Sequence, residues 1–183
     1  FNNDVIARYD VTEENVGEWF QTFSSCFNID QNNIWITSAK GIGKLGLGNS
    51  LFKSYNDKLK NFGFIHVNCL YNTSSGKILL GLKSGLKEFD ANTNKSRVIE
   101  KTDYYYHIFK GPDNKILISG AKKFSCLNGG RLVDVGTVFP ELKPYTGYTF
   151  ISSAWLNDSL LILGTENGMG ILVWNYKQHS VRN

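Results

Sequence analysis

One short apolar phrase occurs four times, in blurred form, along this 183-residue chain. Each copy begins with an aliphatic run and continues through small or polar residues; the copies lie at residues 34–42, 78–86, 116–124 and 161–169. Their starting residues are 44, 38 and 45 positions apart. A period near 40 residues, made of short strands, is typical of β-propeller blades. We therefore expect an all-β protein built from four-stranded antiparallel blades.

The residues around each copy predict the strand order within a blade. A short β-branched or aromatic run precedes each phrase and is expected to form the innermost strand, at residues 23–27, 67–71, 105–109 and 150–154. The phrase itself is a nearly continuous apolar run, as expected of a second strand that neighbouring blades bury on both faces. A third strand and an outer strand follow, the outer one at residues 96–99, 131–135 and 180–181.

Glycines mark the turn after the second strand in three of the repeats. Gly41, Gly85 and Gly168 hold this place, where we expect a tight turn with positive φ. Lys123 holds it in the third repeat, so that turn must differ.

The repeats divide the chain into blades at residues 21–64, 65–103, 104–148 and 149–183. Residues 1–20 are expected to hold half a blade more, because residues 8–13 align with residues 88–93. A closed ring needs a whole number of blades, so about four and a half blades predict a partial propeller from a larger ring. A partial ring exposes a blade face and unpaired strand edges. We therefore expect self-association or packing against missing blades of the same protein.

Composition narrows the classes of partner. The chain is 42% hydrophobic and 14% aromatic, which indicates a folded protein. Its net charge of +4 comes from 20 Lys and Arg residues scattered singly, so neither a nucleic-acid partner nor a membrane patch is expected. The apolar run near Leu160 is too short for membrane insertion. Because the chain begins with Phe1, we expect any leader or anchor to lie outside it.

Several motifs resemble cofactor or metal sites but lack the neighbouring residues or structure that such sites require. Gly41, Gly43 and Gly46 match the dinucleotide fingerprint, but no helix pattern follows, which favours a turn in a repeat and no cofactor. The three histidines His66, His107 and His179 fall at different phases of the blade, so no metal site is expected. The three cysteines Cys26, Cys69 and Cys126 are widely spaced and predict buried thiols without a disulfide framework.

Equivalent positions on the innermost strands hold Ser25, Cys69, His107 and Ser152. A serine and a histidine there resemble a nucleophile and its base, but the sequence shows no orienting acid. The alternative is a lining of small residues around a narrow central axis.

Aromatic residues supply the candidate ligand-binding set, which consists of Tyr104, Tyr106, His107, Tyr145, Tyr148 and Trp155. Strand alternation places Tyr105 and His107 on one face, and Tyr104 and Tyr106 on the other. Sugars present apolar C–H faces and hydroxyl groups, which suit tyrosine and tryptophan beside polar side chains. Residues 138–148 form a long connection that we expect to be a binding loop. Core packing against the next blade is the competing explanation.

The repeat resembles the two-component regulator propeller repeat, with its pattern Asp-x-x-Asn/Gly-x-Ile-Trp-Ile-Gly-Thr-x-x-Gly-Leu-x-x-Phe-Asp. Residues 30–42 carry the Asp, Ile-Trp-Ile and Gly parts, residues 76–90 the Gly-Leu-x-x-Phe-Asp half, and residues 161–168 the Gly-Thr-x-x-Gly core. Only the first copy has the tryptophan, and the third lacks the glycine.

The resemblance implies a propeller of the seven-bladed type in the periplasmic sensor region of a Bacteroidetes-type hybrid two-component histidine kinase. It further implies a noncatalytic module that senses a ligand, with an oligosaccharide as the expected ligand, while kinase activity belongs to the parent protein. The first alternative is a propeller scaffold for protein–protein interaction, which the missing Gly-His and Trp-Asp motifs weaken. The second is a propeller lyase or glycosidase, which needs acids clustered at one mouth.

Overall fold

The computed structural model describes residues 23–30, 33–38, 41–46, 52–54, 66–166, 168 and 170–183. These residues form four antiparallel sheets of four strands, each in sequence order. The predicted half blade at residues 1–20 lies outside the described residues. No helix in the described ranges has the length and apolarity needed to cross a bilayer.

Each sheet contributes one strand to each of four positions. The innermost strands are β1 (Phe23–Asp30), β5 (Val67–Asn72), β9 (Tyr105–Lys110) and β13 (Phe150–Trp155). The second strands are β2 (Asn33–Ser38), β6 (Ile78–Leu82), β10 (Ile116–Gly120) and β14 (Leu160–Thr165). The third strands are β3 (Gly41–Gly46), β7 (Gly85–Asp90), β11 (Phe124–Asn128) and β15 (Ile171–Asn175). The outer strands are β4 (Phe52–Ser54), β8 (Lys95–Glu100), β12 (Arg131–Asp134) and β16 (Ser180–Arg182).

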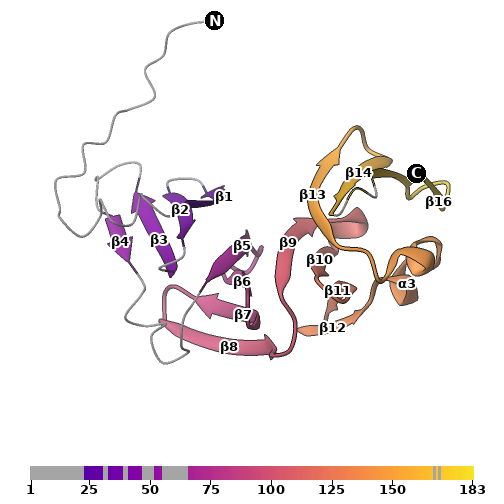
Figure 1. The fold of residues 1–183 in the computed structure, drawn as a ribbon. Helices are drawn as coiled ribbons and strands as arrows, with labels where there is room; N and C mark the ends of the chain where they lie inside the picture. Colours follow the sequence, from indigo (N-terminus) through magenta and orange to yellow (C-terminus); the bar gives the residue numbers. More distant parts are fainter. Residues whose placement is uncertain are drawn as a thin grey trace, which may run out of the picture.

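The sheets follow one another in an arc, with their innermost strands toward the centre (Figure 1). Along this arc β1 contacts β5, β5 contacts β9, and β9 contacts β13. The protein is therefore a partial β-propeller, and the fold class expected from the repeat is confirmed. Residues 41–46, which match the dinucleotide fingerprint, form strand β3 between β2 and β4 and not the expected turn.

The hydrophobic core lies between the sheets. All five residues of β6 are buried, as expected for a second strand covered on both faces. Leu80 joins the core cluster shared with Trp35 of the first sheet, whereas Leu79 joins the cluster shared with Ile118 of the third. A further cluster joins the third and fourth sheets and includes Phe124 and Trp174. Each fully buried large aliphatic side chain contributes about 1.5–3 kcal/mol, so sheet-to-sheet packing stabilises the arc.

The register of every innermost strand is interrupted, and in β5, β9 and β13 the interruption is a one-residue β-bulge. Pairing with the second strand skips Asn68 in β5, Tyr106 in β9 and Ile151 in β13, and the register of β1 shifts between Ser24 and Phe27. A bulge adds one unpaired residue and so reverses the alternation of side chains beyond it. The bulges therefore recur near the start of each innermost strand, at one end of the propeller axis.

The bulge in β9 corrects one prediction from strand alternation. Tyr105 packs with Cys69 between the second and third sheets, whereas His107 bonds Ser153 of the fourth sheet. These two side chains were expected on one face and lie on opposite faces, because Tyr106 shifts the phase between them. Cys69 and His107 occupy equivalent positions, as predicted, but they face the next sheet and do not line a central channel.

The predicted positive φ at the turn glycines is confirmed at the two positions whose backbone angles are described. Gly85 has φ +137° and Gly168 has φ +72°, both in the region that favours glycine. In the third sheet the turn is closed by a hydrogen bond from the Gly120 N–H to the Lys123 carbonyl, at 2.9 Å.

The connection between the third and fourth sheets is helical. The outer strand ends at Asp134, one residue before the predicted end, because Val135 begins helix α3 (Val135–Val138). The Asp134 carboxylate accepts a hydrogen bond from the Gly136 N–H at 2.8 Å, which caps this helix. A 3₁₀ helix, η3 (Pro140–Tyr145), follows and buries Leu142 in the core. The segment expected to be a binding loop is thus a packed cover over the last two sheets.

Candidate functional site

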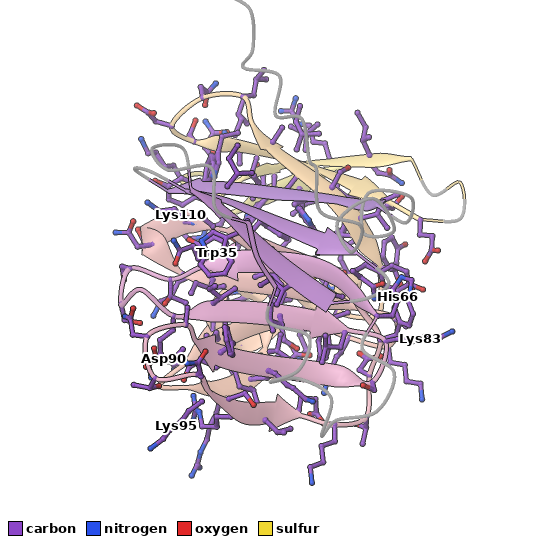
Figure 2. All side chains as sticks on the ribbon, turned by 90° about the vertical axis from the view of Figure 1, so that its left-hand side faces the viewer. Trp35, His66, Lys83, Asp90, Lys95 and Lys110 are labelled. Carbon is purple, nitrogen blue, oxygen red and sulfur yellow. The ribbon has the colours of Figure 1, made fainter. Side chains whose placement is uncertain are left out.

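The innermost strands run between two ends of the molecule. Figure 2 shows His66 and Lys83 at one end, and Lys110, Asp90 and Lys95 at the other. Since Tyr104 precedes β9 as His66 precedes β5, it lies at the His66 end. The five residue steps from Tyr105 to Lys110 along β9 separate the two ends of this strand by roughly 17 Å.

The structure therefore splits the six candidate residues. Tyr104 and Tyr106 lie together at the start of β9. Trp155 ends β13 and bonds the carbonyl of Lys110, the last residue of β9, at the opposite end. The six side chains do not form one wall.

At the His66 end, two tyrosine rings are held by an asparagine of the second sheet. The rings of Tyr104 and Tyr106 have centroids 4.5 Å apart. The Tyr104 hydroxyl donates to Asn68 Oδ1 at 3.2 Å, and Asn68 Nδ2 donates to the Tyr105 carbonyl at 3.0 Å. Buried Asp103 accepts from the Tyr104 N–H at 2.9 Å. This group, Asn68, Asp103, Tyr104 and Tyr106, is called the tyrosine cluster below.

Two of its members are the bulge residues of neighbouring sheets. The register between β5 and β6 skips Asn68, and the register between β9 and β10 skips Tyr106. Burial is the largest cause that raises the pKa of Tyr106, and the Glu166 carboxylate adds to it. The Tyr106 phenol therefore stays neutral at pH 7, with the Glu166 carboxylate nearby.

His107 faces away from this cluster. Its Nε2 lies 2.9 Å from Ser153 Oγ, and its ring stacks on Phe109 with centroids 4.9 Å apart. Burial lowers the pKa of His107 to about 4, so the ring is neutral and weakly basic at pH 7. Ser152 holds the position equivalent to His107 in the fourth sheet, but Ser153, which follows the bulge at Ile151, is the serine that contacts His107. The pair lies between two sheets and is suited to holding them together.

Tyr145 and Tyr148 belong to the helical cover. Their rings are perpendicular, with centroids 5.5 Å apart, and both pack against the core of the third and fourth sheets. Tyr148 also lies 6.4 Å from Phe150, centroid to centroid. These contacts fix the entry of the chain into β13.

The other ionisable candidates lie far from one another in the fold. His66 is exposed, and His179 lies 3.5 Å from Glu141 in the turn before β16. Within the described part of the chain, no group of three His, Cys, Asp or Glu side chains could hold a metal ion. Cys69 and Cys126 are buried thiols, as predicted, and the Cys26 side chain lies outside what is described.

At the Lys110 end, a hollow of about 570 Å³ lies where the third and fourth sheets meet. Trp155 is 40% exposed, and its Nε1 donates to the Lys110 carbonyl at 3.1 Å. The Tyr176 ring stands at 88° to the indole, with centroids 5.9 Å apart. Polar residues from two turns complete the lining, namely Asp113 and Asn114, and Asn157 and Asp158. We call this the Trp155 hollow; sequence reasoning named only its tryptophan.

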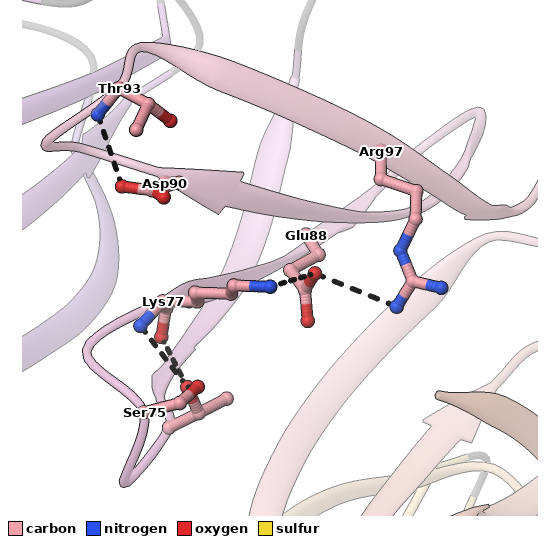
Figure 3. A network of polar contacts seen from close by, with 7 residues as sticks. Ser75, Lys77, Glu88, Asp90, Thr93 and Arg97 are labelled. Atoms are coloured by element: carbon pink, nitrogen blue, oxygen red, sulfur yellow. Dashed lines mark hydrogen bonds and ion pairs between the residues drawn. The ribbon is translucent and has the colours of Figure 1, made fainter. Parts of the chain in front are cut away.

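A polar network covers the outer half of the second sheet at the same end (Figure 3). Lys77 Nζ and Arg97 Nη2 approach the same oxygen of Glu88, at 3.1 and 3.5 Å. Asp90 accepts from the backbone N–H groups of Asn92 and Thr93, and these bonds lower its pKa. Because Lys77 and Arg97 share the Glu88 carboxylate, we interpret this network as a clamp that links β6, β7 and β8.

Comparison with known proteins supports the fold. No family model matches the chain, and no curated protein matches it. Among solved structures, the extracellular domain of the hybrid two-component system BT4673 from B. thetaiotaomicron aligns with a TM-score of 0.67 at 12% identity, over 86% of this chain and 21% of that one. The corresponding domain of BT3049 from the same organism aligns with a TM-score of 0.62 at 15% identity, over 86% and 24%.

A propeller from another setting also aligns. The β-propeller domain of Cps50 (Swd1) from Myceliophteria thermophila gives a TM-score of 0.54 at 12% identity, over 84% of this chain and 56% of that one. The chain spans about a fifth to a quarter of the length of the two-component structures. At these identities the likeness concerns the fold alone: the chain shares successive four-stranded propeller blades with these domains.

Proposed function

We propose that this chain is a noncatalytic part of the periplasmic, ligand-sensing region of a hybrid two-component histidine kinase. One observation carries the proposal: four consecutive blades follow the arrangement found in the extracellular domains of BT4673 and BT3049. The resemblance of the sequence repeats to the two-component regulator propeller repeat supports the same assignment. In this proposal the kinase activity belongs to the parent protein.

We further propose that an oligosaccharide binds at the tyrosine cluster. Tyr104 and Tyr106 offer aromatic surface, and their hydroxyl groups can exchange hydrogen bonds with a sugar. Asn68 holds Tyr104 in place from the neighbouring sheet, so a bound sugar would contact two blades at once. Binding would then be sensitive to the relative position of those blades, which is a means of reporting occupancy to the rest of a receptor.

The outer face of the fourth sheet is proposed to pack against another blade of the same protein. Ile151 and Ile171 are 49% and 55% exposed there, whereas the faces between the four sheets are buried. Self-association of the chain at micromolar concentration, lost when flanking blades are included, is the expected result in light scattering. A monodisperse monomer of the isolated chain would contradict this part of the proposal.

A scaffold for protein partners is the second candidate. The exposed face of the fourth sheet favours it, and the Swd1 propeller shows that the fold occurs outside sensors. The full gene separates the two candidates, since a sensor requires a downstream membrane helix and kinase domain. A long propeller array without them would favour the scaffold.

Ligand binding is tested by thermal shift of the intact receptor ectodomain against a panel of oligosaccharides. A stabilising ligand is expected, and Tyr106→Ala should abolish its shift. Tyr71→Ala, near the opposite end of β5, is the matched aromatic control and should leave the shift unchanged. Flat responses across the panel would remove the oligosaccharide from the proposal, and equal effects of the two variants would remove the tyrosine cluster.

A further inference from the structure

The Trp155 hollow forms a second site, separate from the tyrosine cluster. We propose that it binds a ligand that carries a protonated amine or quaternary ammonium group. The site lies at the Lys110 end of the propeller, whereas the tyrosine cluster lies at the His66 end. The inference therefore stands or falls independently of the proposed sensing of an oligosaccharide.

Two aromatic rings give the hollow a cation-binding wall. The Trp155 indole is anchored by its hydrogen bond to the Lys110 carbonyl, yet 40% of the residue remains exposed. Tyr176 stands at 88° to it and forms a second wall. An ammonium group within about 6 Å of such a ring is attracted by the negative face of its π system, and tryptophan is the strongest partner.

Two carboxylates supply the counter-charge. Asp113 comes from the turn after β9 and Asp158 from the turn after β13, so each of two neighbouring sheets provides one. Within the described residues, neither side chain has a hydrogen-bond or ion-pair partner. Both line an open hollow and both remain available to a ligand.

The two turns are fixed before any ligand arrives. Asn157 Oδ1 accepts from the N–H groups of Ser159 and Leu160, at 2.9 and 3.0 Å, which orders the turn that carries Asp158. The Gly111 N–H donates to the Lys115 carbonyl at 2.8 Å, which closes the other turn. Such preorganisation lowers the entropic cost of binding.

Lys110 decides between a cationic and an anionic ligand. It is the one cation in the lining, against two carboxylates, and it forms no ion pair with either of them in the described structure. The hollow thus carries a formal excess of one negative charge beside two aromatic faces. An anion would face both carboxylates, whereas a neutral sugar would stack on Trp155 without using their charge.

The test follows the Trp155 indole N–H resonance in NMR titrations of the 183-residue chain, assigned with Trp155→Phe. The probes are choline, glucosamine and Nα-acetyl-lysine amide, with glucose and N-acetylglucosamine as neutral counterparts. All three amines are expected to shift the resonance, because they share the ammonium group. Their relative affinities distinguish a quaternary amine, an amino sugar and a lysine side chain as the source of that group.

Charge variants make the test specific. Asp113→Asn combined with Asp158→Asn should weaken amine binding at least about tenfold, as the loss of two opposing charges requires. Lys110→Gln should strengthen it, since the backbone carbonyl that holds Trp155 is retained. Glu166→Gln, at the other end of the molecule, is the matched control and should change nothing. Equal shifts with glucose, unchanged affinity in the double variant, or no shift with any amine at tens of millimolar would overturn the proposal.

Discussion

Replacing Gly81 with alanine tests whether the bulged innermost strand dictates small residues on the second strand. A methyl group at Gly81 would overlap the Sγ atom of Cys69 and lie 3.1 Å from the Cβ of Tyr105. Cys69 reaches this place because the bulge at Asn68 turns it toward the third sheet. Cys69 and Tyr105 are both buried, so neither can move into solvent.

Overpacking a buried site costs about 1–3 kcal/mol, and the overlap with a buried neighbour places Gly81→Ala at about 2–3 kcal/mol. Cys69→Ala alone should cost about 1 kcal/mol, through the loss of a buried sulfur. In the double variant the overlap with sulfur is gone, so the total should be about 2 kcal/mol. The two substitutions should therefore be coupled by about 1–2 kcal/mol.

Urea unfolding followed by tryptophan fluorescence measures these free energies of unfolding. Gly147→Ala is the matched control, because no atom lies within 4 Å of a methyl group there, and it should change the free energy by less than about 0.5 kcal/mol. If the double variant equals the sum of the single variants within about 0.5 kcal/mol, Cys69 does not determine the glycine at position 81. A changed m-value would show that the variants altered more than packing.

Three further predictions concern buried polar groups and acid stability. Trp174→Phe removes the 2.9 Å hydrogen bond to the nearly buried Glu141 and should lower the free energy of unfolding, measured in urea, by about 2–3 kcal/mol. Trp155→Phe removes an exposed hydrogen bond to the Lys110 carbonyl and should lower it by less than about 1 kcal/mol. Burial lowers the pKa of His107 in the folded state to about 4 from its usual 6.5, so the unfolded chain takes up a proton more readily. The free energy of unfolding should therefore fall as the pH drops from 6.5 to 4. His107→Gln should make the urea midpoint less dependent on pH over that range. The hydrogen bond from Lys123 is the largest cause that lowers the pKa of Glu100 from 4.5 to about 2. The stabilisation that ionised Glu100 provides is therefore fully present above pH 4.5 and is lost as the pH falls toward 2. Glu100→Gln should reduce the change in thermal midpoint between those pH values, and an unchanged acid profile would refute this.

The strand order could be predicted because it rests on features that recur in every copy. An apolar run such as residues 78–82 must be covered on both faces, and the polar turn before it must reverse the chain. These requirements place β6 between β5 and β7 without any knowledge of the rest of the molecule. Period and hydrophobicity are therefore sufficient for the fold class.

The direction of individual side chains could not be predicted in the same way. The bulge residues Asn68, Tyr106 and Ile151 share no residue type, so no sequence pattern marks them. A bulge bends the strand and increases its local twist, so it belongs to the path of the backbone and not to a residue type. Alternation counted from the sequence consequently fails after Tyr106, and His107 was assigned to the wrong face.

The candidate site shows both outcomes. The meeting of Tyr104 and Tyr106 followed from their spacing of two residues, which the centroid distance of 4.5 Å confirms. The separation of Trp155 from the two tyrosines could also be predicted from the sequence. Trp155 aligns with Lys110 at the end of the innermost strand, whereas the tyrosines lie at the start of that strand. The partners of Trp155 in the hollow come from turns, whose side-chain directions depend on backbone angles that the sequence leaves open.

The bulges also explain which residue pairs must change together in such a repeat. Cys69 and Ser152 stand over Gly81 and Gly164, where a methyl group would overlap their Sγ and Oγ atoms. In the third sheet the pair is His107 and Ser119; the imidazole turns to Ser153, and the Ser119 hydroxyl accepts from the Phe150 N–H at 2.7 Å. One position on the innermost strand thus sets both the residue opposite it and the way the next sheet is attached. The glycine of the Gly-Thr phrase is accordingly a packing requirement between the innermost and second strands of one blade.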